Sequence, residues 1–215
     1  MRHHFTRLCG LLVLLALPGF AAAEPSWRDF PGVSNSSFIE PNGDRAIQLS
    51  IEVPADPDAV FNAFTTSEGF RSWAVPVARI DLRTGGMIES SYDAGASIGD
   101  RDNIRNEILA FIPDRLLVIR NVQAPRSFVD PELFQRTVTI IEFASAGANR
   151  TRVTLTNSGY GSGAGFDRLY RQFEWGDAYS LASLRRRFEQ GPVDWSRRAP
   201  RAAATTATEH AEGGR

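Results

Sequence analysis

Apolar residues take every second position in the first regular segment of the chain, which starts near Arg45. The alternation runs through Ile47, Leu49, Ile51 and Val53. A period of two is the pattern of a strand that buries one face and exposes the other. The segment therefore predicts a half-buried strand, which Pro54 ends.

A short helix is expected directly after this strand. Asp56 has a side chain suited to the N-cap, and Pro57 suits the first helical position. The apolar stripe that would face the core consists of Val60, Phe61 and Phe64. A second short turn is expected to carry Phe70 and Trp73.

Short apolar segments separated by turn residues fill the middle of the chain. Glycine, proline, asparagine and aspartate punctuate them, as they do in turns. The predicted strands are 77–82, 87–92, 103–112, 116–121, 136–143 and 151–157. Because they are short and follow one another closely, they favour an antiparallel meander over a parallel sheet with crossover helices.

The strongest helical pattern comes last in the predicted fold. Apolar residues recur at steps of three and four from Phe166 to Phe188, and Gly191 with Pro192 stops the pattern. One strand, two short helices, a run of antiparallel strands and one long helix form a helix-grip order of the α+β class.

Five blocks of sequence follow one another within this order. They are VPADPDAVF at 53–61, Trp73, DLRTGG at 81–86, IPDRL at 112–116 and TRVTLTNSGY at 151–160. Together they resemble the START-like (SRPBCC) superfamily, most of all the branch named after the activator of the heat shock protein 90 ATPase. The resemblance spans Arg45 to Glu189 and implies a curved antiparallel sheet wrapped around a long C-terminal helix, with an apolar cavity between them. It implies no single activity, because members include lipid carriers, hormone receptors, aromatic cyclases and chaperone co-factors.

The first residues of the chain have the three parts of an export signal. Basic residues precede an apolar run at 11–17, and small residues lead up to Glu24. We expect a signal peptide at 1–23, an irregular lead-in at 24–44, one START-like domain at 45–196 and a disordered tail at 197–215. The apolar run is too short to span a bilayer, so stable membrane insertion is not expected. The mature protein is expected in the periplasm or outside the cell, where the ATP-dependent chaperone of the namesake is not expected.

Composition narrows the chemistry of the predicted domain. From Glu24 to Glu209 the chain contains no histidine, lysine or cysteine, the side chains behind most nucleophilic and proton-transfer chemistry near neutral pH. A Schiff-base lysine, a thiolate nucleophile and a histidine-ligated metal are therefore excluded there, and we expect no cofactor and no metal. A formal net charge of −1 gives no reason to expect nucleic acid or an anionic membrane as a partner.

Asp177 interrupts the apolar stripe of the closing helix. The neighbouring positions of the stripe are Phe173 and Leu181, so a carboxylate is expected where the helix meets the core. It could bind a polar group of a ligand, or act as a base if burial raises its pKa. Alternatively it forms a salt bridge with a strand arginine, Arg105 or Arg120, because an unpaired buried charge is costly.

Eight further residues are candidates for the lining of a ligand site. The aromatic candidates are Trp73, Tyr92, Tyr160, Trp175 and Tyr179. The polar candidates, which could orient a ligand, are Asn106, Arg120 and Asn157. Aromatic rings with a polar tip suit a hydrophobic ligand. The alternative is that the rings are ordinary core and that the polar strand residues face solvent.

The sequence favours an exported domain that binds a small apolar or amphipathic molecule, without chemistry, between its sheet and its C-terminal helix. One alternative is an acid-base enzyme of the cyclase or hydrolase kind, with Asp177 or Glu107 as base and Tyr160 or Tyr179 as acid. Another is a module that presents a sheet edge or the arginine run 185–187 to an exported protein partner. A continuous cavity lined by residues 73, 175, 177 and 179 would support ligand binding, and a filled interior would support the protein-binding module.

Overall fold

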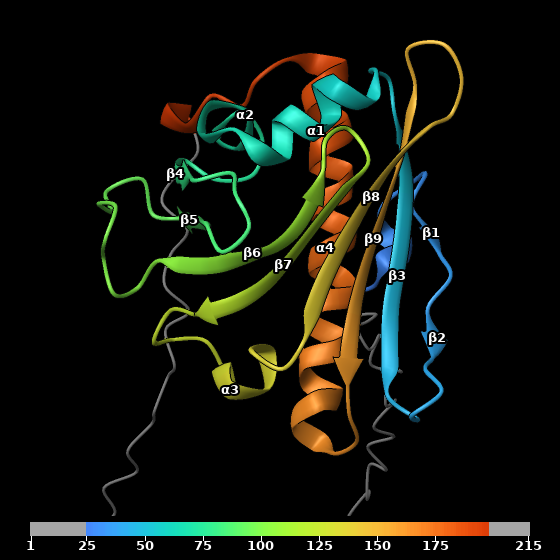
Figure 1. The fold of residues 1–215 in the computed structure, drawn as a ribbon, viewed down its shortest axis with the longest axis vertical. Coiled ribbons are helices and arrows are strands. Elements are labelled where there is room, and N and C mark those ends of the chain that lie inside the picture. The colour runs from blue at the N-terminus through green and yellow to red at the C-terminus, as the bar shows by residue number, and fades with distance from the viewer. Residues whose placement is uncertain (1–24, 198–215) are drawn as a thin grey trace, which may run out of the picture.

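A curved antiparallel sheet wraps around one long helix, α4 (Ala164–Gln190), in the computed structural model (Figure 1). The structure describes residues 25–197. The predicted signal peptide, and the predicted tail from residue 198 onwards, lie outside the described residues. Within 25–197, no helix is both long enough and apolar enough to cross a membrane. The α+β helix-grip fold expected from the sequence is thus confirmed.

The nine strands within residues 25–197 form one sheet, and their order in the sheet departs from their order in the chain at one place. The strands are β1 (Ser34–Asn35), β2 (Phe38–Ile39), β3 (Arg45–Val53), β4 (Val77–Ile80), β5 (Met87–Ser91), β6 (Ile104–Ile112), β7 (Leu116–Gln123), β8 (Val138–Ser145) and β9 (Thr151–Tyr160). The sheet order is β1-β3-β9-β8-β7-β6-β5-β4, with β2 also paired to β3. The strands from β4 to β9 are the predicted meander, and β3 joins its far end by pairing with β9.

The helices are α1 (Pro57–Thr65), α2 (Ser67–Arg71), α3 (Pro131–Phe134) and α4, with 3-10 turns at Trp27–Asp29 and Trp195–Arg197. Helices α1, α2 and α4 lie close to where the sequence predicts them, whereas α3 falls in a stretch that the sequence indicates as a turn. Asp56 is the N-cap residue of α1, but its side chain makes no capping hydrogen bond. Thr66 does cap α2, by accepting from the N–H of Gly69 at 3.0 Å. Gly191 ends α4 at φ 92°, a conformation that glycine adopts without strain.

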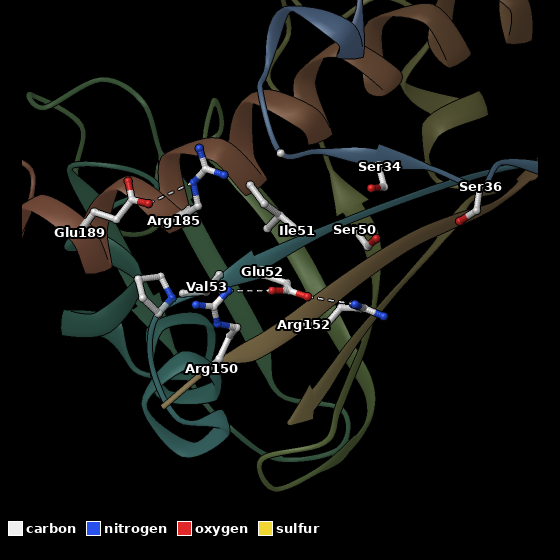
Figure 2. A pocket seen from close by; sticks show the side chains of 12 residues that line it. Ser34, Ser36, Ser50, Ile51, Glu52, Val53, Arg150, Arg152, Arg185 and Glu189 are labelled. Atoms are coloured by element: carbon white, nitrogen blue, oxygen red, sulfur yellow. Dashed lines mark hydrogen bonds and ion pairs between the residues drawn. The ribbon is translucent and has the colours of Figure 1, made fainter. Parts of the chain in front are cut away.

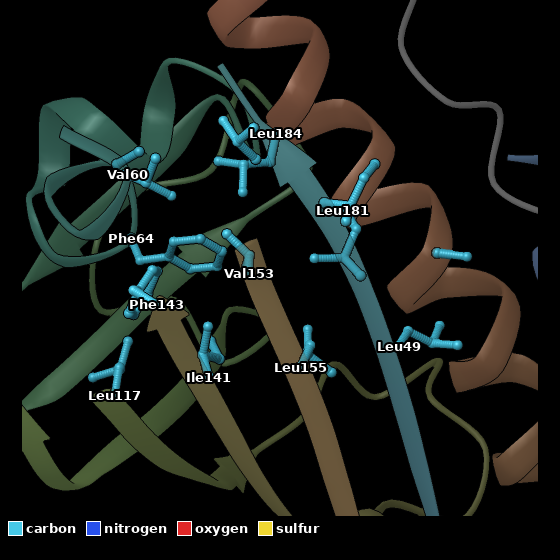
Figure 3. Close-up of a cluster of buried hydrophobic side chains, with 14 of the residues drawn as sticks. Leu49, Val60, Phe64, Leu117, Ile141, Phe143, Val153, Leu155, Leu181 and Leu184 are labelled. Atoms are coloured by element: carbon cyan, nitrogen blue, oxygen red, sulfur yellow. The ribbon is translucent and has the colours of Figure 1, made fainter. Parts of the chain in front are cut away.

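The core lies between the concave face of the sheet and α4 (Figure 3). Leu49 on β3 and Val153 on β9 lie beneath Leu181 and Leu184 of α4, and all four side chains are buried. Helix α1 covers one end of this layer with Phe64, whose ring meets the ring of Phe143 edge to face. Burial of such side chains contributes about 1.5–3 kcal/mol each.

The lead-in at 24–44 is more ordered than the sequence indicates. It contains a 3-10 turn and the two-residue strands β1 and β2, which pair with the outer edge of β3. Two-residue strands are too short for a period of two to be recognised in the sequence. The ring of Phe30 then packs against Trp175 on α4, with the ring centroids 5.7 Å apart. The lead-in therefore covers part of the face of α4 that the sheet leaves free.

Leu184→Ala should lower the free energy of unfolding by about 2–5 kcal/mol, because it leaves a cavity where sheet and α4 meet. Urea unfolding followed by circular dichroism measures this change. Ile112→Ala is the matched control, since Ile112 is 48% exposed, and it should change stability by at most about 0.5 kcal/mol. A loss below about 1 kcal/mol for Leu184→Ala would contradict this role for α4.

Candidate functional site

Asp177 lies in the middle of α4 and is buried against the concave face of the sheet. One of its carboxylate oxygens, Oδ2, accepts a hydrogen bond from Nδ2 of Asn157 on β9 at 2.7 Å. The salt bridge considered from the sequence is absent within 25–197. Arg120 pairs with Glu107 instead, at 2.9 Å on the outer face of the sheet. A neutral amide, not a guanidinium, is therefore the hydrogen-bond partner that holds Asp177.

Asn157 is held in turn by the neighbouring strand. Thr139 on β8 lies directly opposite it in the strand register, and the Thr139 hydroxyl donates a hydrogen bond to Oδ1 of Asn157. Because the amide oxygen of Asn157 accepts from Thr139, the amide NH2 group of Asn157 points towards Asp177. The three side chains form a polar chain from β8 across β9 to α4.

Tyr160 brings a second polar group to this part of the core. It ends β9 with a completely buried side chain, and its hydroxyl is one of the buried atoms of the described chain without a hydrogen-bond partner. Its ring packs edge to face against Tyr170 of α4, 5.3 Å between centroids. Burial, and then the negative charge of Asp177, hold the pKa of Tyr160 well above its ordinary value. The phenol therefore stays protonated and can donate a hydrogen bond.

The carboxyl group of Asp177 has an unusual protonation equilibrium. Burial raises its pKa to about 7, because the charged form loses its hydration, and the hydrogen bond from Asn157 opposes part of this rise. Both protonation states are therefore populated at neutral pH. In its ionised form Asp177 accepts hydrogen bonds, and in its protonated form it can also donate one.

A second polar pair lies on the same face of the sheet, on β6 and β7. Asn106 shares the concave face with buried Ile108, since the two are two residues apart in one strand. Asn121 lies opposite Asn106 and donates to its Oδ1 at 3.1 Å, while Oδ1 of Asn121 is buried without a partner. The concave face thus carries polar side chains on β6, β7, β8 and β9.

The remaining predicted ligand residues lie elsewhere. Trp73 is buried in the core, where its indole N–H donates to the carbonyl of Ala63 at 2.9 Å. Tyr92 is 58% exposed just after β5, and Arg120 lies on the outer face of the sheet. The structure therefore joins Asp177 to Asn157 directly and places Tyr160 within range of the charge of Asp177, whereas Trp73, Tyr92 and Arg120 lie apart from them.

Trp175 and Tyr179 also face away from the sheet. They stack on each other with centroids 5.5 Å apart, and Phe30 of the lead-in packs against both. Each lies two positions from Asp177, which is about 200° around a helix of 3.6 residues per turn. Residues 73, 175, 177 and 179 consequently do not line one continuous cavity, so the cavity that would have supported ligand binding from the sequence is not formed by these residues.

The structure shows open grooves away from this polar chain. One of about 670 Å³ lies between the lead-in, the end of β3 and the last turns of α4 (Figure 2). Another of about 550 Å³ lies beside Pro57 and Arg115. Neither is lined by Asp177, Asn157 or Tyr160. Among residues 25–197 no group of three or more acidic, histidine or cysteine residues is placed to hold a metal ion.

The sequence gives no sign of one buried carboxylate, Glu89 on β5. It is 3% exposed because the loop after β5 folds over it, and its side chain accepts from Asn103 at 2.8 Å and from the N–H of Gly99. Burial alone would raise the pKa of Glu89, but these hydrogen bonds and the charge of Arg79 outweigh it and lower the pKa. Glu89 follows the buried Ile88 in the strand, so its side chain points to the other face of the sheet, where solvent would be expected. Only the loop after β5 buries it there.

Comparison with known proteins identifies the family of the chain. A family model described as Activator of Hsp90 ATPase homolog 1-like protein matches residues 54–189. No protein with a curated description matches the chain closely enough to count as a relative.

Several solved structures are similar to this one at low sequence identity. The Aha1 dimer from Colwellia psychrerythraea is 20% identical, with 68% of this chain and 97% of that chain covered and a TM-score of 0.51. Protein MLL2253 from Mesorhizobium loti is 17% identical, with coverage of 69% and 100% and a TM-score of 0.55. CalU16 from Micromonospora echinospora is 20% identical, with coverage of 76% and 86% and a TM-score of 0.51. At these identities the likeness concerns the fold alone.

The pH dependence of stability should reveal the protonation of Asp177. Its folded pKa of about 7 exceeds the ordinary 3.8, so the folded state binds the proton more tightly. The resulting stabilisation is fully present below about pH 4 and is lost as the pH rises through about 7, up to about 4 kcal/mol in all. Asp177→Asn should therefore be more stable than the wild type at pH 8, with the difference shrinking towards pH 4.5.

Urea unfolding at intervals from pH 4.5 to 8 measures this difference. Asp58→Asn, which changes an exposed carboxylate on α1, is the control and should follow the wild type. Parallel curves for Asp177→Asn and the wild type would show that Asp177 has an ordinary pKa.

Proposed function

The chain belongs to the Activator of Hsp90 ATPase homolog 1-like family, and from this premise we propose that it binds a small apolar or amphipathic molecule between its sheet and α4. The apolar part of the ligand replaces side-chain contacts in the core, and its polar group meets Asp177 and Tyr160. Binding of this kind needs no chemical step.

The Tyr160 hydroxyl is the observation that carries this proposal. It is buried without a partner in a core whose other polar groups on β8 and β9 are joined by hydrogen bonds. A buried polar group without a partner costs about 1–3 kcal/mol. A ligand that offers a hydrogen-bonding group at this position removes the cost, and we propose that Asp177, whose charge acts on Tyr160, binds the polar end of the same ligand.

On this proposal the segment around α3, which packs on α4 without a buried residue of its own, moves for a ligand to enter. This four-residue helix lies beside the lower half of α4 in Figure 1, and its Phe134 packs on Phe173 of α4, 4.7 Å between centroids. An exposed ion pair between Asp130 and Arg168, 2.7 Å long, links the segment to α4. An exposed ion pair contributes at most about 1 kcal/mol, so the ring contacts of Phe134 are the larger part of what displacement of α3 would break.

The polar chain suits a ligand with one hydrogen-bonding group on an apolar body. Asn157 fixes one oxygen of Asp177, which leaves the other oxygen to the ligand. Because Asp177 populates both protonation states near neutral pH, it can accept from a hydroxyl or amine or donate to a carbonyl. The predicted export signal would place this binding activity outside the cytoplasm.

Asp177→Leu and Tyr160→Phe should each weaken the binding of a neutral apolar probe, N-phenyl-1-naphthylamine, by about tenfold, since each removes a hydrogen-bonding group from a dry site. Probe fluorescence titrated with the full-length protein gives the affinities. Native mass spectrometry of protein purified from its own host identifies any retained ligand.

Stability provides the control for the tyrosine variant. Tyr160→Phe removes a buried hydroxyl without a partner, so the free protein should become more stable by about 1 kcal/mol while the affinity falls. Asp58→Asn should leave the affinity unchanged and lower the stability by at most about 1 kcal/mol, because Asp58 lies in the first turn of α1. The proposal fails if the probe binds both core variants as tightly as the wild type, or does not bind the wild type at all.

A further inference from the structure

The outer edge of β3 is covered along only part of its length. β1 pairs with it no further than Ser50, which lies opposite Ser34, and β2 pairs near its start. The stretch 50–54 instead lines the groove of about 670 Å³ between the lead-in and the last turns of α4 (Figure 2). This groove, named the edge groove here, lies where the sheet has an open side.

The backbone of Glu52 faces the edge groove. Gln48 points its backbone groups outwards, because its N–H donates to the Ser37 hydroxyl at 3.1 Å and its C=O accepts from the N–H of Ser36 at 2.9 Å. Residues two apart in a strand turn their backbone groups to the same side. Ser50 and Glu52 therefore face outwards as well, and Glu52 lies beyond the end of β1. An extended segment can form hydrogen bonds there.

Arginine side chains lie on both sides of this open edge. Figure 2 shows Arg185 of α4 on one side of β3, and Arg150 and Arg152 near the start of β9 on the other. Glu52 accepts from Arg150 at 3.1 Å and from Arg152 at 2.9 Å. Glu189 pairs with Arg185 at 3.3 Å. The groove is lined by three guanidinium groups and two carboxylates, so it carries a net positive charge. Each guanidinium has five N–H donors, and many of these are not used by the ion pairs and can bind another acceptor.

The lead-in fixes the position of Arg185. Gly32 has φ 86°, and the guanidinium of Arg185 packs so closely against it that a Cβ at residue 32 would overlap Nη1. The side chain of Arg185 is 30% exposed, against 56% for Arg150 and 58% for Arg152. Arg185 is therefore the most firmly placed positive charge of the groove.

We propose that the edge groove binds an extended acidic segment of a protein partner. Successive side chains of a strand point to opposite faces. Two adjacent acidic residues would consequently reach Arg185 on one side of β3 and Arg152 on the other, while the segment's backbone pairs with Glu52. The short side chains of Ser34 and Ser50, directly opposite each other in the register, leave room for it.

The probe is a fluorescently labelled, capped peptide with paired glutamates, Thr-Glu-Glu-Thr-Glu-Glu-Thr. It is titrated with the full-length protein, and binding is followed by fluorescence anisotropy. We expect saturable binding that Arg185→Gln and Arg152→Gln each weaken about threefold to tenfold. Gly32→Ala should weaken it similarly by displacing Arg185. Arg83→Gln is the matched control at the opposite edge of the sheet, where Arg83 pairs with Asp81, and it should leave the affinity unchanged.

Nuclear magnetic resonance locates the peptide, since the amide resonance of Glu52 should shift as its N–H gains a partner. The proposal is overturned if a peptide with glutamine in place of glutamate binds as tightly, or if Arg83→Gln weakens binding as much as Arg185→Gln. Displacement of the peptide by equimolar inorganic phosphate would also overturn it, because it would make the groove a site for small anions.

Discussion

The contact between α4 and the concave face of the sheet is the interaction on which the rest of the structure depends. It is made where β3 and β9, the first long strand and the last, lie side by side. Leu181 and Leu184 of α4 pack there over Leu49 and Val153. Because the two strands are about a hundred residues apart in sequence, this contact closes the fold. The packing of α4 on them fixes which face of the helix is turned to the core.

The same contact places Asp177 in a region that an apolar residue would fill more favourably. The energetic consequence is the raised pKa, since the charged form is destabilised by burial. Asn157 and Thr139 compensate in part by directing an amide N–H at the carboxylate. The buried hydroxyl of Tyr160 has no hydrogen-bond partner, which lowers the stability of the fold. Proteins often keep such destabilising residues where they are needed for function.

A different constraint acts at the edge of the sheet. β3 is nine residues long, and β1 and β2 each pair with two of them. Open strand edges invite pairing with other chains, and here charged side chains surround the opening. The interior and the edge can therefore serve separate partners, the first by apolar burial and the second by charge and backbone pairing. This arrangement accommodates both the ligand-binding and the protein-binding hypotheses without requiring them to share residues.

The sequence by itself determined the fold class and the periodic elements, because periods of two and of 3.6 are written locally. It also pointed to Asp177, a carboxylate on an apolar stripe. Helix geometry alone would have separated Trp175 and Tyr179 from Asp177. Only the tertiary structure decided that β3 pairs with β9, that Asn157 is the partner of Asp177, and that a loop buries Glu89. These outcomes depend on contacts between segments far apart in the chain, which no local pattern encodes.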